Sequence, residues 1–195
     1  LLGSIFDQLM SVGVLALIVI FQDEIRRFFK TLGTHRHFRT LAGFFSRKEN
    51  GDEKASLVPV VMACMSLSQQ KVGALIVVER NENLDEFVQT GERIDAALSQ
   101  RLIEAIFFKN APLHDGAIVI QNGRITAAQC ILPVSHNLNI PKKLGLRHRA
   151  AMGVAEKTDA LAVIVSEETG AISVAKDGKF MLNLDAHKLE EILSK

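Results

Sequence analysis

Three short, uninterrupted runs of apolar residues constrain the fold of this chain more than any other feature of its sequence. They span residues 72–78, 117–120 and 161–165. Each run has the length of a β-strand, and the first and last are typical of strands that are buried on both faces of a sheet. Segments with helical spacing lie between these runs. The sequence therefore predicts an α/β fold, a twisted mixed β-sheet flanked by helices.

Turn and capping residues place the remaining elements. Asn122-Gly123 predicts a tight hairpin between two strands, and Asp177-Gly178 predicts a second hairpin near the C-terminus. Asp185 is suited to cap a last helix that runs through Leu193. Helices are expected at 54–69, 92–108, 148–156 and 185–193, and strands at 72–78, 117–121, 124–132, 161–165, 171–175 and 179–182.

Composition limits the class of protein. Apolar residues make up 48% and charged residues 23% of the 195 positions, which is typical of a folded globular chain. A net charge of +1 argues against a general nucleic-acid-binding protein, because such proteins usually carry a basic excess. Cys64 and Cys130 each lie in an apolar run, so we expect two buried thiols and no disulfide, in a reduced cytosolic setting.

The first 21 residues predict the end of a membrane anchor. They hold a single charged residue, Asp7, and a basic flank follows at 26–39. An apolar stretch of about 20 residues just suffices to cross a bilayer, and a basic flank is typical of the cytoplasmic side. A buried helix of a soluble protein is the alternative. We therefore expect a transmembrane end at 1–21, a juxtamembrane helix and polar linker at 22–53, and a cytoplasmic domain at 54–195.

A carboxylate and an imidazole stand at a predicted bend before the apolar run at 117–120. Asp115 and His114 directly precede Gly116, and Asp-Gly on its own is ordinary turn chemistry. Carboxylates at the ends of strands in an α/β sheet commonly face the ligand crevice, and Gly116 would let a phosphate or base approach the backbone. His114 is either a metal ligand or an exposed loop residue.

Two arginines and a histidine come together at the predicted start of a helix. Arg147, His148 and Arg149 could form a solvated basic turn. Cations at a helix N-terminus oppose the helix dipole, however, and a bound anion would reconcile them, because helix N-termini and guanidinium groups both bind phosphate. The string therefore predicts a phosphate site.

The loop at 166–170, Ser-Glu-Glu-Thr-Gly, follows a predicted buried strand. Its composition is that of an ordinary loop, but a second carboxylate near Asp115 would suit a divalent cation. An acid that can hold a metal, together with arginines that can hold phosphates, indicates phosphoryl or nucleotidyl transfer.

Four strings in their order along the chain, at 73–76, 115–117, 147–149 and 166–170, resemble the diadenylate cyclase family. The chain is similar over nearly its whole length to the membrane-anchored bacterial class of these enzymes. The resemblance implies condensation of two ATP molecules into cyclic di-AMP, with release of two pyrophosphates. It also implies a divalent metal, Mn²⁺ or Mg²⁺ or Co²⁺, and a homodimer in which two sites face each other. A membrane regulatory protein is implied as a partner.

The resemblance implies roles for the matching residues. Asp115 would activate the 3′-hydroxyl and hold the metal together with His114 and Glu168, and Gly116 and Ala117 would line the reacting ribose and phosphate. The positions that would bind substrate are Ala74, Leu132, Arg147, His148, Arg149, Ser166 and Glu168. Of these, the two apolar residues would border the adenine, Glu168 would complete the metal's surroundings, and the others would contact phosphates.

One residue departs from the family pattern. Leu146 precedes the Arg-His-Arg string where the family often has a threonine, so a hydroxyl contact to phosphate is missing.

Two other functions remain open. A catalytically silent sensor would bind ATP or cyclic di-AMP without turnover, and a metal-dependent phosphohydrolase would use water and release AMP or ADP. Because Asp115 and both arginines are present, the sequence favours the cyclase.

Overall fold

The computed structural model describes residues 17, 19, 21–22, 56–141 and 143–194. The chain divides into two units, 1–51 and 52–195, and the fold below is that of the second unit. Apart from four positions, the predicted membrane segment at 1–21 and the juxtamembrane region at 22–53 lie outside the described residues. Within the described part of the chain, no helix has the length and hydropathy to cross a bilayer.

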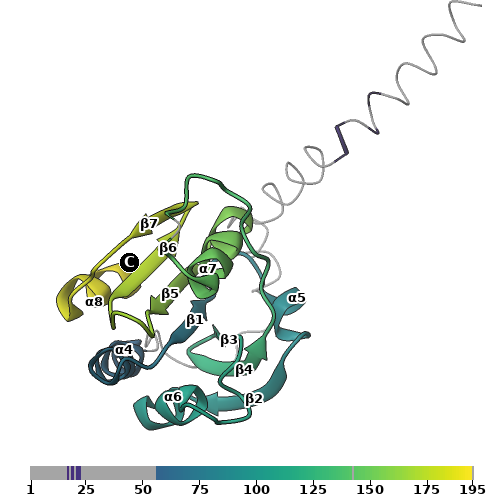
Figure 1. The fold of residues 1–195 in the computed structure, drawn as a ribbon. Helices are drawn as coiled ribbons and strands as arrows, with labels where there is room; N and C mark the ends of the chain where they lie inside the picture. The colour runs from purple at the N-terminus through teal and green to yellow at the C-terminus, as the bar shows by residue number, and fades with distance from the viewer. Residues whose placement is uncertain (1–16, 18, 20, 23–55, 142, 195) are drawn as a thin grey trace, which may run out of the picture. The chain divides into compact units, whose positions relative to one another are not determined.

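A mixed β-sheet forms the centre of the second unit, in the strand order β2-β4-β3-β1-β5-β6-β7 (Figure 1). Strands β1 and β3 pair in parallel, and the other neighbours pair antiparallel. This confirms the predicted mixed sheet. The strands are β1 Ala74–Val78, β2 Glu92–Ala97, β3 Ala117–Gln121, β4 Arg124–Cys130, β5 Leu161–Val165, β6 Ile172–Lys176 and β7 Lys179–Met181.

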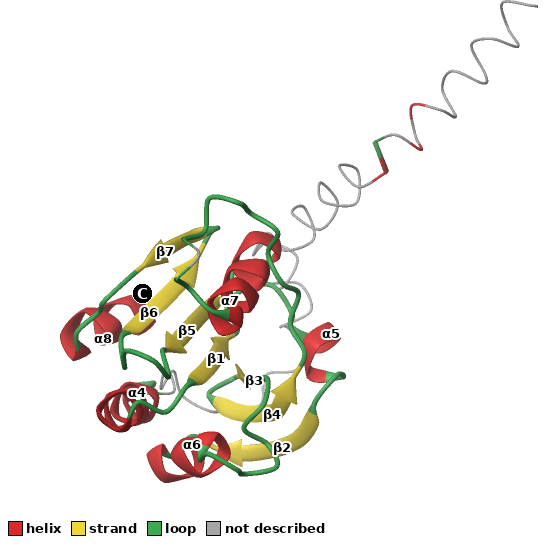
Figure 2. Ribbon diagram, in the orientation of Figure 1, coloured by secondary structure: helices red, strands yellow, loops and turns green. Residues whose placement is uncertain are grey.

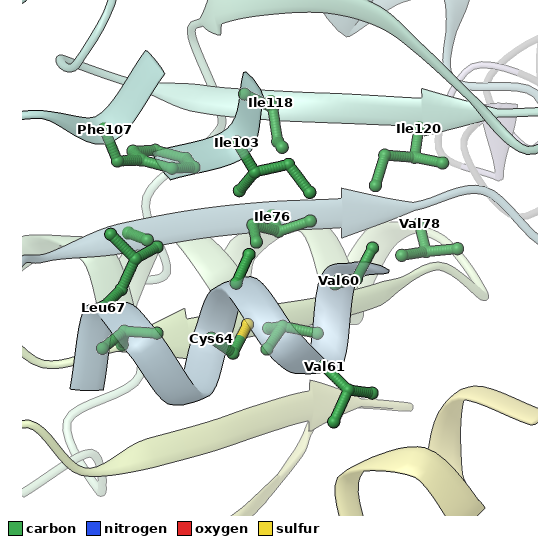
Figure 3. Packing of buried hydrophobic residues seen from close by; sticks show 14 of the residues in the cluster. Val60, Val61, Cys64, Leu67, Ile76, Val78, Ile103, Phe107, Ile118 and Ile120 are labelled. Atoms are coloured by element: carbon green, nitrogen blue, oxygen red, sulfur yellow. The ribbon is translucent and has the colours of Figure 1, made fainter. Parts of the chain in front are cut away.

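Helices cover both faces of the sheet, and the central strands are buried because of it. Side chains alternate along a strand, so neighbouring residues enter different cores. Ile76 packs with α4, α6 and α8, as Figure 3 shows for the first two, whereas Leu75 packs with α5 and α7. The helices are α4 Val58–Gln70, α5 Asp85–Val88, α6 Gln100–Phe107, α7 Leu146–Lys157 and α8 Ala186–Ser194.

The predicted turns and caps are confirmed. Asn122-Gly123 and Asp177-Gly178 both adopt positive φ angles at the tips of their hairpins, as a two-residue turn of this kind requires. The Oδ1 atom of Asp185 accepts a hydrogen bond of 2.8 Å from the backbone N–H of Lys188 at the start of α8. This hydrogen bond lowers the pKa of the Asp185 carboxyl.

The helix predicted over 92–108 is wrong in its first half. Residues 92–97 form β2, which pairs with β4 at the edge of the sheet, and only 100–107 are helical. Ile94 and Leu98 suggest helical spacing, but Ile94 and Ala96 are the half-buried positions of an alternating edge strand. A register shift with a positive φ angle at Asp95 interrupts the pairing and hides the strand pattern from the sequence.

The middle of α7 approaches the backbone of the loop at 131–145, which joins β4 to α7 (Figure 2). A Cβ atom added at Gly153 would lie 2.0 Å from the carbonyl oxygen of Pro133. We expect Gly153→Ala to lower the melting temperature by about 5 °C or more, because overpacking costs about 1–3 kcal/mol. Thermal unfolding measures this effect.

Gly145→Ala is the matched control, because no atom lies within 4 Å of a Cβ added there. This variant should melt within about 2 °C of the parent chain. Alanine is a better helix former than glycine by about 1 kcal/mol. A Gly153→Ala chain as stable as the parent would therefore contradict the prediction and show that the loop shifts to make room for the methyl group.

Candidate active site

A cavity of about 780 Å³ opens between the end of β4, the first turn of α7 and the loop from β5 to β6. Its walls come from segments that are far apart in the sequence. Seven of the residues predicted for the site line it: Asp115, Gly116, Leu132, Arg147, His148, Ser166 and Glu168. The fold therefore brings residues of all four sequence strings to one space, the string at 73–76 through Leu75 alone.

Four predicted residues do not line the cavity. Ala74 belongs to the core on the opposite face of the sheet, and its neighbour Leu75 lines the cavity in its place. Ala117 is buried behind the cavity wall, and the half-buried Arg149 makes no hydrogen bond or ion pair through its side chain with the described residues. His114 lies next to the cavity, beside Asp115.

The His114 imidazole is held toward the Asp115 carboxylate. Its Nδ1 atom lies 2.6 Å from the carbonyl oxygen of Ala111, which can only accept a hydrogen bond, so Nδ1 carries the proton. The Nε2 atom faces the carboxylate and lies 3.6 Å from Asp115 Oδ1. A backbone hydrogen bond of this kind is typical of histidines that bind metals.

The two side chains form a pair, not a complete metal cage. No group of three or more His, Cys, Asp or Glu residues in the described part of the chain is arranged to hold a metal. The Asp115 side chain is 78% exposed, so its outer face is open to a ligand. An imidazole nitrogen and a carboxylate oxygen suit Mn²⁺, and Mg²⁺ prefers oxygen donors.

A tight backbone bend presents Asp115. Gly116 has a φ angle of +93°, and an added Cβ would lie 2.9 Å from the carbonyl oxygen of Cys130. Only glycine adopts this conformation without strain. On the neighbouring strand β4, Gln129 also has a positive φ angle, and the pairing of β3 with β4 is irregular. Its amide donates a hydrogen bond of 3.3 Å to the carbonyl oxygen of Pro112 in the same bend.

Arg147 is fixed by an ion pair that the sequence did not predict. Its Nη1 atom donates a hydrogen bond of 2.7 Å to Glu167 Oε2, and the Arg147 side chain is only 26% exposed. The pair lies directly over Gly73, where an added Cβ would be 2.8 Å from Nη1. Glu167 and Arg147 both line the cavity. The guanidinium is thus positioned on one side, and its other donors bond to none of the residues that the structure describes.

His148 is buried, with 6% of its surface exposed, and its ring meets Phe180 edge-on at a centroid distance of 6.0 Å. Burial lowers its pKa below the usual value, so the ring is neutral at pH 7. His148 therefore adds no positive charge to the phosphate site predicted at 147–149. The ring can instead donate one uncharged N–H.

The cavity also has walls that sequence reasoning missed. These are mainly Leu75, Cys130, Ile131, Lys143, Thr169, Ser173, Leu182 and Asn183. The run at 72–78 has no polar position, so its sequence does not indicate that Leu75 is the residue that faces the cavity. Burial raises the pKa of the Cys130 thiol to about 11, so the thiol stays protonated. This confirms the predicted buried state of Cys130, and Cys64 is buried as well.

Several related proteins are similar in sequence to this chain along most of its length. The family described as DisA bacterial checkpoint controller nucleotide-binding matches residues 61–180. Cyclic di-AMP synthase CdaA of Bacillus subtilis is 41% identical over 192 residues, which are 97% of this chain and 68% of that protein. The chain belongs to the diadenylate cyclase family. A diadenylate cyclase of Listeria monocytogenes is 37% identical over 98% of this chain and 68% of its own length.

Two solved structures agree with this family assignment. A double cysteine mutant of DacA from Staphylococcus aureus has a TM-score of 0.71 and 44% identity, and the match covers 73% of this chain and 95% of that one. A hypothetical membrane spanning protein from Bacillus cereus has a TM-score of 0.65 and 35% identity, and the match covers 93% of this chain and 90% of that one. The CdaA N-terminal transmembrane domain matches residues 1–25, which confirms the membrane-anchored class among diadenylate cyclases.

Proposed function

We propose that this chain condenses two ATP molecules into cyclic di-AMP and releases two pyrophosphates. The observation that carries the proposal is the cavity in which the Asp115 carboxylate and the Arg147 guanidinium share one space. In each half of the reaction, the 3′-oxygen of one ATP bonds to the α-phosphorus of the other. The bond from that phosphorus to pyrophosphate breaks, and Asp115 accepts the proton of the 3′-hydroxyl.

The cavity of about 780 Å³ accommodates one ATP. Each ATP must present its 3′-hydroxyl to the α-phosphate of the other, so two such cavities have to face each other. The 78% exposure of the Asp115 side chain supports this arrangement, because the carboxylate can reach a nucleotide held by a second subunit. Catalysis then depends on positioning and charge stabilisation. We therefore propose a face-to-face homodimer as the active form.

The residues present fit a divalent metal, Mn²⁺ or Mg²⁺ or Co²⁺. His114 Nε2 and the Asp115 carboxylate would hold it, and phosphate oxygens of the substrate would complete its ligands. Glu168, predicted as a third metal ligand, lines the same cavity but forms no metal-binding group with these two among the described residues. When bound, the metal neutralises charge on the phosphates. Arg147 would bind phosphate through the donors that Glu167 leaves free, and Ser166 would donate its hydroxyl from the same wall. Leu132 would border the adenine.

We propose that residues 54–195 form the cyclase domain and lie in the cytoplasm, and that residues 1–21, which precede it in the chain, are a membrane anchor. The division of the chain into units at 1–51 and 52–195 supports this organisation. The match of residues 1–25 to a transmembrane domain supports the anchor. Residues 22–53 would connect the two and transmit the effect of a membrane regulatory protein.

The proposal is tested by incubating the full chain, in detergent, with ATP and Mn²⁺ or Mg²⁺ and identifying the products by mass. We expect cyclic di-AMP, with a specific activity that rises with protein concentration until dimers saturate. Rising activity is expected because a monomer binds only one of the two ATP molecules that react. Oligomeric state is measured in parallel by light scattering.

Three outcomes would contradict the proposal. Constant specific activity where monomers predominate would exclude the face-to-face mechanism. AMP or ADP as the only product would indicate the phosphohydrolase. Binding of ATP without any product, at concentrations where dimers predominate, would indicate the silent sensor.

A further inference from the structure

The loop at 166–170 is bound to the last turn of helix α4, at a serine that does not line the cavity. The Ser68 hydroxyl donates a hydrogen bond of 2.6 Å to the carbonyl oxygen of Gly170, which lies 102 positions further along the chain. Gly170 is buried, and an added Cβ there would lie 2.6 Å from the backbone carbonyl oxygen of Ser68. The end of the loop therefore packs directly on the backbone of α4.

Hydrogen bonds within the loop make it one compact turn. The N–H of Gly170 donates to the carbonyl oxygen of Ser166 at 2.9 Å, and the N–H of Ser166 donates to the carbonyl oxygen of Ala171 at 3.0 Å. The Ser166 hydroxyl accepts a hydrogen bond of 3.3 Å from the N–H of Thr169. Residues 166–169 all line the cavity. A displacement of Gly170 would therefore move the cavity-lining residues with it.

Two side-chain hydrogen bonds join this loop to other elements, counted over the residues that the structure describes. One is the bond from Ser68, and the other is the ion pair of Glu167 with Arg147 on α7. Glu167 and Gly170 lie three positions apart in the same turn. The position of Glu167, and with it the orientation of the Arg147 guanidinium, thus depends on where Ser68 holds Gly170.

The turn that follows α4 contacts the same ion pair. At Gly73 in this turn, an added Cβ would lie 2.8 Å from Arg147 Nη1 and 3.0 Å from Glu167 Oε2. The N–H of Lys71, at the end of α4, donates a hydrogen bond of 3.1 Å to the carbonyl oxygen of Ser68. The end of α4 and the turn after it therefore support both the loop and the ion pair.

We propose that Ser68 is a positioning residue for the triphosphate site, because its hydrogen bond fixes the loop at 166–170 so that Glu167 orients Arg147. The inference rests on the proposed function, in which Arg147 binds phosphate. The Ser68 hydroxyl is the one donor to the Gly170 carbonyl oxygen among the described residues. Buried carbonyl groups are nearly always paired, so the loop shifts toward another donor when this hydroxyl is removed.

Calorimetric titration of the full chain, in detergent with Mg²⁺, against the α,β-methylene analogue of ATP tests the proposal. The carbon bridge of the analogue does not break, so no turnover is needed. Ser68→Ala should raise the Kd for the analogue about tenfold, the loss expected when a hydrogen bond to a charged phosphate is weakened. Alanine is a good helix former, so α4 should persist, and thermal unfolding checks this.

Ser66→Ala is the matched control. Ser66 lies on the same helix, and its hydroxyl is hydrogen-bonded to Gln70 and Glu104 instead of to the loop. This variant also removes the hydrogen bonds of a helix serine. Its Kd for the analogue should stay within about twofold of the parent value, because it contacts neither the loop nor the ion pair.

The Arg147→Ala background shows whether Ser68 acts through the ion pair. There, adding Ser68→Ala should change the Kd by less than about twofold, because no guanidinium is left to be oriented. An equal loss in both backgrounds would overturn the proposal, since the serine would then support binding by another route. An unchanged Kd in Ser68→Ala alone would overturn it as well.

Failure of the proposed function is seen separately. A chain that binds the analogue but makes no cyclic di-AMP from ATP would refute the cyclase, and the titrations would still decide the role of Ser68. A parent chain that does not bind the analogue would overturn the proposed ATP site and the positioning role together.

Discussion

Asp115→Asn is expected to reduce the formation of cyclic di-AMP about 10³-fold, the range for loss of a general base. Asparagine keeps the shape of the side chain, but it cannot accept the proton of the 3′-hydroxyl and brings no charge to a metal held with His114. Because the Asp115 side chain is 78% exposed, the melting temperature should not change. ATP binding should remain, since the phosphate contacts lie on other elements.

The measurement is the initial rate of cyclic di-AMP formation, with the Kd for ATP and the melting temperature determined on the same preparations. Asp177→Asn is the matched control, because Asp177 is also an exposed aspartate followed by glycine, in the turn between β6 and β7. The control should keep full activity. More than a tenth of the parent rate in Asp115→Asn would remove the carboxylate from the mechanism.

The sequence predicts most of the fold because its strongest signals are local. The three apolar runs are long enough for strands and too short for most helices, and they become β1, β3 and β5. The Asn-Gly and Asp-Gly hairpins require positive φ angles that few other dipeptides accept, and the structure has them. Each of these signals depends on residues within a few positions of one another.

The fold features that the sequence did not predict depend on distant partners. Strand β2 exists because β4 is available to pair with it, and its own residues carry half of a helical pattern. The choice between Ala74 and Leu75 at the cavity has a similar cause. Both lie in a run without polar positions, so nothing local says which one faces α7.

The candidate site shows the same limit. The strings at 115–117, 147–149 and 166–170 could be recognised, and parts of all three line one cavity. The ion pair of Arg147 with Glu167 could not be predicted, because it joins two segments whose distance from each other depends on the whole sheet. The neutral state of His148 likewise follows from burial against Phe180, which lies on β7.

Arg147→Ala is expected to lower kcat/KM for ATP about 100-fold, which corresponds to about 3 kcal/mol. The change removes a phosphate donor from the cavity. It also leaves the Glu167 carboxylate, 2.7 Å from the guanidinium in the parent, without its neutralising partner and close to the negative triphosphate. Initial rates of cyclic di-AMP formation over a range of ATP concentrations give the loss.

Two further variants separate these contributions. Arg147→Lys keeps the positive charge without the planar set of donors, and it should retain more activity than Arg147→Ala.

The double variant Arg147→Ala with Glu167→Gln should be less impaired than Arg147→Ala alone, because it removes the uncompensated carboxylate. If the double variant instead loses the sum of the two single effects, Glu167 acts independently of Arg147. If Arg147→Ala keeps kcat/KM within threefold of the parent value, the guanidinium does not bind a phosphate of ATP. The triphosphate would then bind at another part of the chain.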